Sequence, residues 1–275
     1  MKYALVDGIK VEAYQGLKGV CPICGSSLIA RCGNRKIHHW AHKGIRNCDS
    51  WWEPETEWHR NWKNNFPIEW QEYLMNDSVT NERHVADIRT ETELVIEFQH
   101  SFINSKEQSS RESFYKNMLW VVDCSRLKRD YTRFQNGRNQ FKNTCREGIF
   151  QVDFPDECFP TSWLDRDVPV VFDFSNTEQI NEQLQFSPAL YCLFPSRGHR
   201  FSIILELKKD NFIKYILQNK WHLIIDEQLK GMWAPKEVNH SIIEKAAPKL
   251  SNFTTYAKPH NWIYDRGAFK RHRRF

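Results

Sequence analysis

The sequence predicts an α/β protein with a small metal-binding module at its N-terminus and a β-rich C-terminal part. Three observations predict this fold. Helix-like and strand-like segments alternate between residues 51 and 150, cysteines and histidines cluster before residue 50, and three apolar strand-like segments follow residue 168. At 275 residues the chain exceeds one average domain. We therefore expect three units, at residues 1–50, 51–150 and 160–275.

Composition limits the class of protein. Hydrophobic residues at 40% and aromatic residues at 14% are typical of a folded globular chain. The formal charge of +5 permits a polyanionic partner but does not require one. The N-terminus lacks the apolar core of a secretory signal, and no stretch approaches 18 apolar residues, so we expect a cytoplasmic protein that does not enter a membrane.

The N-terminal module carries a pattern typical of zinc binding. Short strands are expected at residues 1–10 and 11–17. Cys21 and Cys24 then form a CxxC motif, which supplies two ligands to a tetrahedral Zn²⁺ from one turn. The other two predicted ligands are His42 and Cys48, and His39 is the main alternative to either. A site filled by four protein ligands is structural; without zinc, the CxxC cysteines would be buried thiols.

A helix is expected to begin after the proline that precedes Glu55. On that helix Glu55, His59 and Lys63 fall at positions i, i+4 and i+8 and share one face. By itself this pattern is typical of a solvated polar stripe. Trp58 and Trp62 lie on a different face and are expected to contact the core.

A predicted β-hairpin brings two acids together. Alternation from Leu94 to Gln99 indicates a strand with Glu97 and Gln99 on one face. A second strand at residues 85–89 precedes it, and a short polar turn joins the two. This hairpin would set Asp87 beside Glu97. Two carboxylates and a third polar group are what Mg²⁺ requires, since it binds oxygen ligands and keeps several waters.

The segments after the hairpin complete an α/β sandwich core. A helix is expected at residues 107–117 and a buried strand at 118–123. Arg111 and Tyr115 lie one helical turn apart, where they either reach phosphate or form a surface pair. Residues 128–142 are basic with interleaved phenylalanines. This segment either lines a nucleic-acid groove or packs as an amphipathic helix.

The C-terminal half has no catalytic signature. Residues 155–169 are expected to form a linker. Strands are expected at 168–174, 189–196 and 201–207, and a helix at 211–219. The basic tail from Arg266 is expected to be disordered.

The order of these motifs resembles a known family. The pattern of PD-(D/E)XK nucleases is matched by Asp87, Glu97 and Gln99, with Gln in place of the usual Lys. Nine residues separate Asp87 from Glu97, and one residue separates Glu97 from Gln99. More narrowly, the chain resembles the competence protein CoiA-like nucleases. The features that carry this resemblance are CPIC at 21–24, HWAH at 39–42, Glu55 with His59 and Lys63, and ADI with IEFQHS followed by the Arg111–Tyr115 helix and the strand at 119–123.

The resemblance implies a PD-(D/E)XK restriction-endonuclease-like core, a mixed sheet flanked by helices. It implies that Asp87 and Glu97 bind catalytic Mg²⁺ or Mn²⁺, that Glu55 completes or supports the metal site, and that Gln99 orients water. His59 or Lys63 would position water or phosphate. The residues expected to contact nucleic acid are His59, Lys63, Arg111 and Tyr115.

The expected function is therefore a metal-dependent DNA nuclease. Its setting would be bacterial DNA processing, either competence and recombination or antiviral defence, with a partner protein of such a system. The alternative is a nuclease-fold DNA-binding or recombination accessory protein that does not cleave. Oligomeric state stays open.

Overall fold

The computed structural model describes residues 1–44, 48–77, 81–175, 189–195 and 201–224. The chain divides into two compact units, Met1–Trp233 and Ala234–Phe275, and every described residue lies in the first. The predicted basic tail lies outside the described residues. Within the described part, no helix has the length and apolar character needed to span a membrane.

The N-terminal module is an antiparallel sheet with strand order β2-β1-β3-β4-β5. Its strands are β1 (Tyr3–Val6), β2 (Ile9–Glu12), β3 (Lys18–Val20), β4 (Ser27–Arg31) and β5 (His39–His42). Asp7 and Gly8 form the turn between β1 and β2, with φ angles of 50° and 81°. A small core around buried Leu28 and Trp40 supports this sheet.

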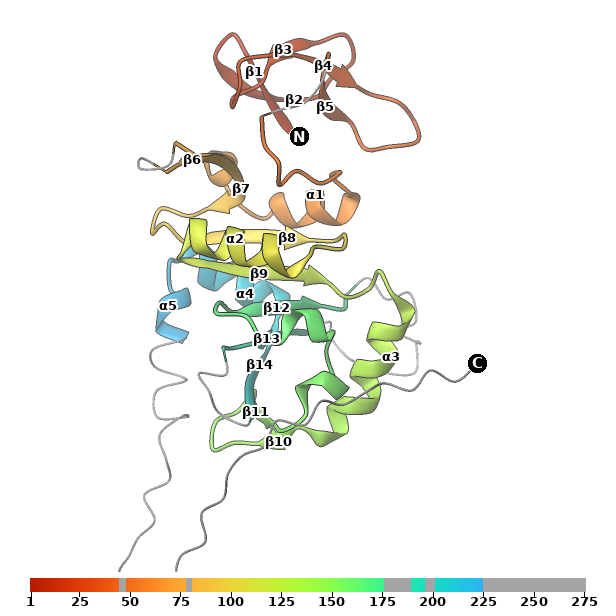
Figure 1. Ribbon diagram of the computed structural model, residues 1–275, viewed down its shortest axis with the longest axis vertical. Coiled ribbons are helices and arrows are strands. Elements are labelled where there is room, and N and C mark those ends of the chain that lie inside the picture. Colours follow the sequence, from red (N-terminus) through yellow and green to blue (C-terminus); the bar gives the residue numbers. More distant parts are fainter. Residues whose placement is uncertain (45–47, 78–80, 176–188, 196–200, 225–275) are drawn as a thin grey trace, which may run out of the picture. The chain divides into compact units, whose positions relative to one another are not determined.

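A mixed sheet forms the rest of the unit, with strand order β10-β11-β14-β13-β12-β9-β8-β7-β6 (Figure 1). Its strands are β6 (Gln71–Asn76), β7 (Arg83–Arg89), β8 (Val95–Gln99), β9 (Met118–Asp123), β10 (Lys142–Asn143), β11 (Ile149–Val152), β12 (Val170–Asp173), β13 (Ala189–Leu193) and β14 (Ser202–Lys208). The pairs β8–β9 and β9–β12 are parallel, and the other pairs are antiparallel.

Helices cover both faces of this sheet. They are α1 (Glu57–Lys63), α2 (Ser105–Tyr115), α3 (Lys128–Gly137), α4 (Lys209–Leu217) and α5 (Trp221–Leu223), with 3₁₀ turns at η1 (Ile68–Trp70), η2 (Arg138–Gln140), η3 (Pro155–Glu157) and η4 (Thr161–Trp163). Ile96 packs in one core with residues of α1, α4 and α5, whereas its neighbour Val95 packs with residues of α2 and α3. Successive strand residues thus serve opposite layers, and the α/β prediction is confirmed.

The strands expected in a separate C-terminal unit extend the core sheet instead. Parallel pairing joins β12 to β9, with Val171 opposite Val121. The expected linker is also packed, because Phe159 is fully buried and Trp163 is 6% exposed. Parallel strands are joined by long crossovers, so their pairing leaves no local turn signal from which the sequence could have revealed it.

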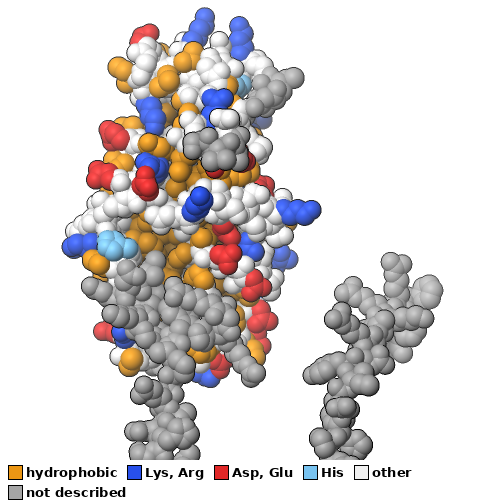
Figure 2. Space-filling model, turned by 60° about the vertical axis from the view of Figure 1, so that its left-hand side comes forward, with side chains coloured by type: hydrophobic (Ala, Val, Ile, Leu, Met, Phe, Trp, Pro, Cys, Tyr) orange, Lys and Arg blue, Asp and Glu red, His pale blue; other side chains and the backbone are white. Residues whose placement is uncertain are grey.

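One face of the described residues carries a mixture of charged and apolar side chains. On the face drawn in Figure 2, basic and acidic side chains are interspersed with hydrophobic ones. The pattern agrees with the modest formal charge of +5. The charge distribution on this face therefore does not mark a binding site, and the local arrangement of side chains has to identify one.

Candidate functional site

The four predicted zinc ligands come together in the N-terminal module. The ligand atoms of Cys21, Cys24, His42 and Cys48 all lie within 4.8 Å of one another. The Sγ atoms of Cys21 and Cys48 are 3.9 Å apart, and His42 Nε2 lies 3.4 Å from Cys24 Sγ. Around a tetrahedral zinc with Zn–S near 2.3 Å, two sulfurs are separated by about 3.8 Å, and sulfur and nitrogen by about 3.6 Å. The cluster therefore fits a metal ion such as Zn²⁺.

Local structure prepares these ligands. The CxxC motif lies in the turn between β3 and β4, where Gly25 has a φ of 69°. The backbone N–H of Ile23 donates to Cys21 Sγ at 3.4 Å, which stabilises a thiolate. His39, the alternative ligand, donates from Nδ1 to the Ile37 carbonyl at 2.8 Å and is not part of the cluster.

The two CxxC thiols differ in their electrostatics. Burial raises the pKa of Cys21. Burial acts in the same direction on Cys24, but hydrogen bonds with Ser26 and His42 outweigh it and lower the pKa of Cys24 to about 6. Since zinc binds the deprotonated thiolate, Cys24 is prepared to ligate near neutral pH.

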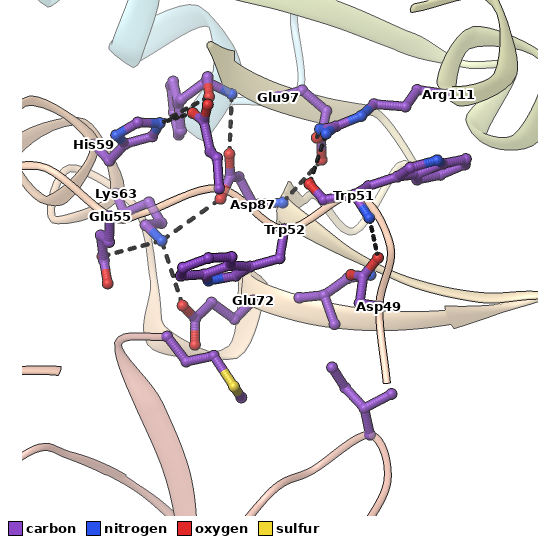
Figure 3. Close-up of a pocket in the computed structure, with 15 residues that line it drawn as sticks. Asp49, Trp51, Trp52, Glu55, His59, Lys63, Glu72, Asp87, Glu97 and Arg111 are labelled. Carbon is purple, nitrogen blue, oxygen red and sulfur yellow. Dashed lines mark hydrogen bonds and ion pairs between the residues drawn. The ribbon is translucent and has the colours of Figure 1, made fainter. Parts of the chain in front are cut away.

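Asp87 and Glu97 lie side by side on β7 and β8, as the hairpin predicted. The backbone N–H of Asp87 donates to Glu97 Oε1 at 3.1 Å, and the N–H of Phe98 donates to Asp87 Oδ2 at 3.0 Å. Both carboxylates line a cavity of about 70 Å³, here named the acid pocket (Figure 3). The side chain of Asp87 is 23% exposed and that of Glu97 is 4% exposed, so Asp87 is the more accessible of the two.

Lys63 lies at the centre of three carboxylates in the acid pocket (Figure 3). Its Nζ is 3.1 Å from Glu55, 3.4 Å from Glu72 and 3.5 Å from Asp87. Burial alone would lower the pKa of Lys63, but the three carboxylates outweigh burial and raise it above its ordinary value. The side chain is therefore a fixed, buried cation next to Asp87.

Glu97 pairs with a second buried cation. Arg111 Nη1 donates to Glu97 Oε2 at 2.8 Å, and its Nη2 donates to the Trp51 carbonyl and to Glu107, both at 2.6 Å. Burial and repulsion from Asp87 raise the pKa of Glu97 to about 8, although Arg111 opposes the shift. Arg111 is thus committed to partners within the protein.

The acid pocket carries more carboxylates than cations. Its acidic lining residues are Asp49, Glu53, Glu55, Glu72, Asp87 and Glu97, and its basic ones are Lys63 and Arg111. Among the described residues, only the Cys/His cluster gathers three or more metal-ligating groups. Magnesium needs only one or two carboxylates besides waters and substrate phosphates. Asp87 and Glu97 are the two carboxylates of the acid pocket that could serve as such ligands, although Lys63 and Arg111 already pair with them.

Glu55 reaches the pocket from outside the helix on which it was predicted. Helix α1 begins at Glu57 with Thr56 as N-cap, because the Thr56 side chain accepts from the N–H of His59. Hydrogen bonding with Arg60 and attraction to Lys63 nevertheless hold Glu55 in the pocket. Burial opposes these interactions, but they lower the pKa of Glu55 to about 2, with attraction to Lys63 the largest favourable cause.

Gln99 faces a neighbouring hollow rather than the acid pocket. Its Nε2 donates to Glu53 Oε2 at 2.9 Å and to the Ser101 carbonyl at 3.1 Å. His59 contacts the same carboxylate, with Nε2 2.5 Å from Glu53 Oε1. Glu53 therefore connects two residues that were predicted to act on substrate.

Tyr115 and part of the 128–142 segment are buried in the core. Tyr115 is 5% exposed and packs in the core against Trp51 and Phe114. Helix α3 buries Phe134 while leaving Arg129 77% exposed. The segment is thus amphipathic, with Arg129 outward, whereas Arg133 is half-buried and Arg138 pairs with Glu206 at 2.9 Å.

Sequence reasoning missed three acids with structural roles. Glu53 links His59 to Gln99, and Glu72 accepts hydrogen bonds from the backbone N–H groups of Lys2 at 2.7 Å and Tyr3 at 2.9 Å. Asp173 is 1% exposed and accepts from the indole N–H groups of two tryptophans of α1. An acid within an apolar stretch was the only available signal, and it does not identify the partner.

The Cys/His cluster and its small sheet define a compact metal-binding module. Residues 10–50 match the family described as competence protein CoiA, N-terminal domain. The N-terminal module is therefore similar to that domain; the match does not extend to the acid pocket. Searches against curated proteins and against solved structures found no match.

Proposed function

We propose that the chain is a metal-dependent DNA nuclease with a PD-(D/E)XK-type core. The observation that carries this proposal is the adjacency of the two carboxylates: the Asp87 backbone N–H donates to Glu97 Oε1, the Asp87 carboxylate accepts from the N–H of Phe98, and Lys63 lies 3.5 Å from Asp87. Asp87 and Glu97 would hold Mg²⁺ or Mn²⁺. Such an ion lowers the pKa of a bound water and neutralises charge on the phosphate.

Lys63 supplies the positive charge that Gln99 lacks. The amide N–H₂ of Gln99 donates to Glu53 and Ser101, whereas Lys63 is a permanent cation beside Asp87. In the proposed mechanism Lys63 holds the phosphate or orients the attacking water at the acid pocket. Glu55 keeps Lys63 in place, since the two are 3.1 Å apart and both buried.

The match of residues 10–50 to the CoiA N-terminal domain suggests a role in competence, and we propose DNA processing in competence or in antiviral defence as the setting. One observation favours a second candidate, a DNA-binding accessory protein that does not cleave. Glu97 is paired with Arg111 at 2.8 Å, and burial raises its pKa to about 8, so a metal must compete with an existing cation and a proton.

The test compares cleavage with folding. Purified protein is incubated with plasmid, linear and single-stranded DNA in Mg²⁺, in Mn²⁺ and in EDTA, beside Asp87→Asn and Glu97→Gln. Each variant keeps the shape of the side chain but removes the charge that binds metal, so we expect metal-dependent cleavage to fall by about a hundredfold or more with an unchanged circular dichroism spectrum.

The exposed residue Glu91 provides the matched control, and Glu91→Gln should cleave like the wild type. Wild-type rates in both acid variants would exclude the acid pocket as the active site. DNA binding without cleavage by the wild-type protein under every metal condition would favour the accessory protein.

A further inference from the structure

A second hollow lies next to the acid pocket, at the carboxyl ends of two parallel strands. Strand β8 ends at Gln99 and β9 ends at Asp123, and both residues line this hollow, whose volume is about 220 Å³. Ligands of open α/β sheets bind in the crevice outside the carboxyl ends of the strands. We name this cavity the strand-end hollow.

At the strand-end hollow, Gln99 carries a buried hydrogen-bond acceptor to which no described residue donates. The side chain is 3% exposed, and its Nε2 donates to Glu53 and to the Ser101 carbonyl, which fixes the orientation of the amide. Its Oε1 is buried and has no donor among the described residues. Buried acceptors are almost always paired, so the missing partner is an N–H or O–H group.

The rim of the hollow favours an anion. Its basic lining residues are Arg126, Arg129 and Arg133. They outnumber the two carboxylates of the lining, Asp123 and Asp130. Asp123 is engaged by His100, whose Nδ1 lies 2.7 Å from its Oδ2. Asp130 lies 3.9 Å from Arg129 Nε and 3.7 Å from Arg133 Nη1, so one carboxylate faces two guanidinium groups, and the arginines keep a net positive charge that attracts phosphate.

An exposed aromatic ring stands at the same hollow. Phe102 lines it and is 79% exposed, whereas Trp163 lines it and is 6% exposed. An unpaired base can stack on such an exposed ring. The bases of a duplex cannot, because their faces are already stacked on one another. A phosphodiester alone has no proton to give Gln99, while a nucleobase carries N–H groups.

We propose that the strand-end hollow binds an unpaired nucleotide of a single DNA strand. Gln99 follows Glu97 by two residues on β8, about 6.6 Å along the strand, so a strand held in the hollow continues into the acid pocket. The hollow thereby selects single-stranded substrate for the cleavage proposed above, and only this link to cleavage rests on the proposed nuclease function. In this proposal the base stacks on Phe102 and donates a hydrogen bond to Gln99, and the phosphate contacts the arginines of the hollow.

Binding is measured without chelator and without added Mg²⁺ or Mn²⁺, so that the Cys/His cluster keeps its zinc and no metal-dependent cleavage is supported. The probe is a fluorescein-labelled single strand of about 12 nucleotides, within the site sizes of single-strand binders, and the readout is anisotropy at constant salt. Stacking of one base predicts that Phe102→Ala weakens binding roughly five- to a hundredfold, while Phe102→Trp binds like the wild type. Phe154, 59% exposed, lies outside the lining, and Phe154→Ala is the matched control.

Two further arms define the ligand. Arg129→Ala should lower the slope of log affinity against log salt by about one, the value for one lost phosphate contact. The unlabelled duplex of the same sequence should compete at least about tenfold more weakly than the single strand, because its bases cannot stack on Phe102.

The outcomes separate this proposal from nuclease activity. Unchanged affinity of Phe102→Ala, or equal competition by duplex, would overturn the strand-end hollow as a nucleotide site even if the protein cleaves DNA. Phe102-dependent binding in a protein that cleaves nothing would support the hollow while excluding the nuclease.

Discussion

The Cys/His cluster and the acid pocket differ in how their charges are balanced. The four ligands of the cluster lie at most 27 residues apart in the sequence. The cluster consists of three cysteines and one histidine and contains no lysine or arginine. The acid pocket already contains Lys63 and Arg111, which pair with its carboxylates. The comparison teaches that a metal in the cluster would supply the charge that its thiolates lack, whereas the carboxylates of the acid pocket are already balanced by cations of the protein.

Removing a zinc ligand should have the largest effect. Cys21→Ser is expected to eliminate the roughly one zinc per chain and unfold the N-terminal sheet, because binding of structural zinc supplies about 10–16 kcal/mol in zinc-finger peptides. Metal analysis of protein purified without chelators and limited proteolysis measure the two effects. His39→Ala is the control and should retain zinc, since His39 lies outside the cluster. Full zinc content in Cys21→Ser would refute the assignment.

Removing the cation of the acid pocket should have an intermediate effect. Lys63→Met leaves three carboxylates around an apolar side chain, and breaking a buried ion pair in this way costs about 3–5 kcal/mol. Urea unfolding measures the loss, and Mg²⁺ should restore more stability to this variant than to the wild type. The exposed Lys106 on α2 is the control, with Lys106→Met expected within about 0.5 kcal/mol of wild type. If Lys63→Met and Lys106→Met were equally stable, the three carboxylates around residue 63 would have to become neutral by taking up protons.

The same contrast explains what the sequence could predict. The zinc ligands were identified because a CxxC turn and nearby His and Cys residues are a local pattern, and the structure gathers the same four residues. The hairpin with Asp87 and Glu97 was also predictable, since strand alternation and a short turn set its register.

Interactions between distant segments were not predictable. Glu72 contacts the backbone of Lys2, 70 residues earlier, and no periodicity relates such positions. Gln99 shares a strand face with Glu97, but hydrogen bonds to Glu53 and to the Ser101 carbonyl direct its amide elsewhere. The extension of the sheet by β12 likewise depends on a nonlocal parallel pairing.

The smallest of the expected effects concerns Glu53 and depends on pH. Burial disfavours its charge, but hydrogen bonding and attraction to His59, followed by hydrogen bonds from Ser101 and the His100 backbone, lower the pKa of Glu53 from 4.5 to about 2. A carboxylate with a depressed pKa stabilises the fold fully above pH 4.5 and loses this contribution as the pH falls toward 2. The shift corresponds to about 3 kcal/mol as an upper bound, for a side chain that is 18% exposed.

Glu53→Gln removes this titration. The variant should be less stable than the wild type at neutral pH, and the difference in unfolding free energy should narrow as the pH falls from 4.5 toward 2. Urea unfolding across this window measures it, with the exposed Glu91→Gln as a control whose difference from wild type stays constant. A constant difference for Glu53→Gln would mean that His59 and Ser101 stabilise the neutral acid as well as the carboxylate.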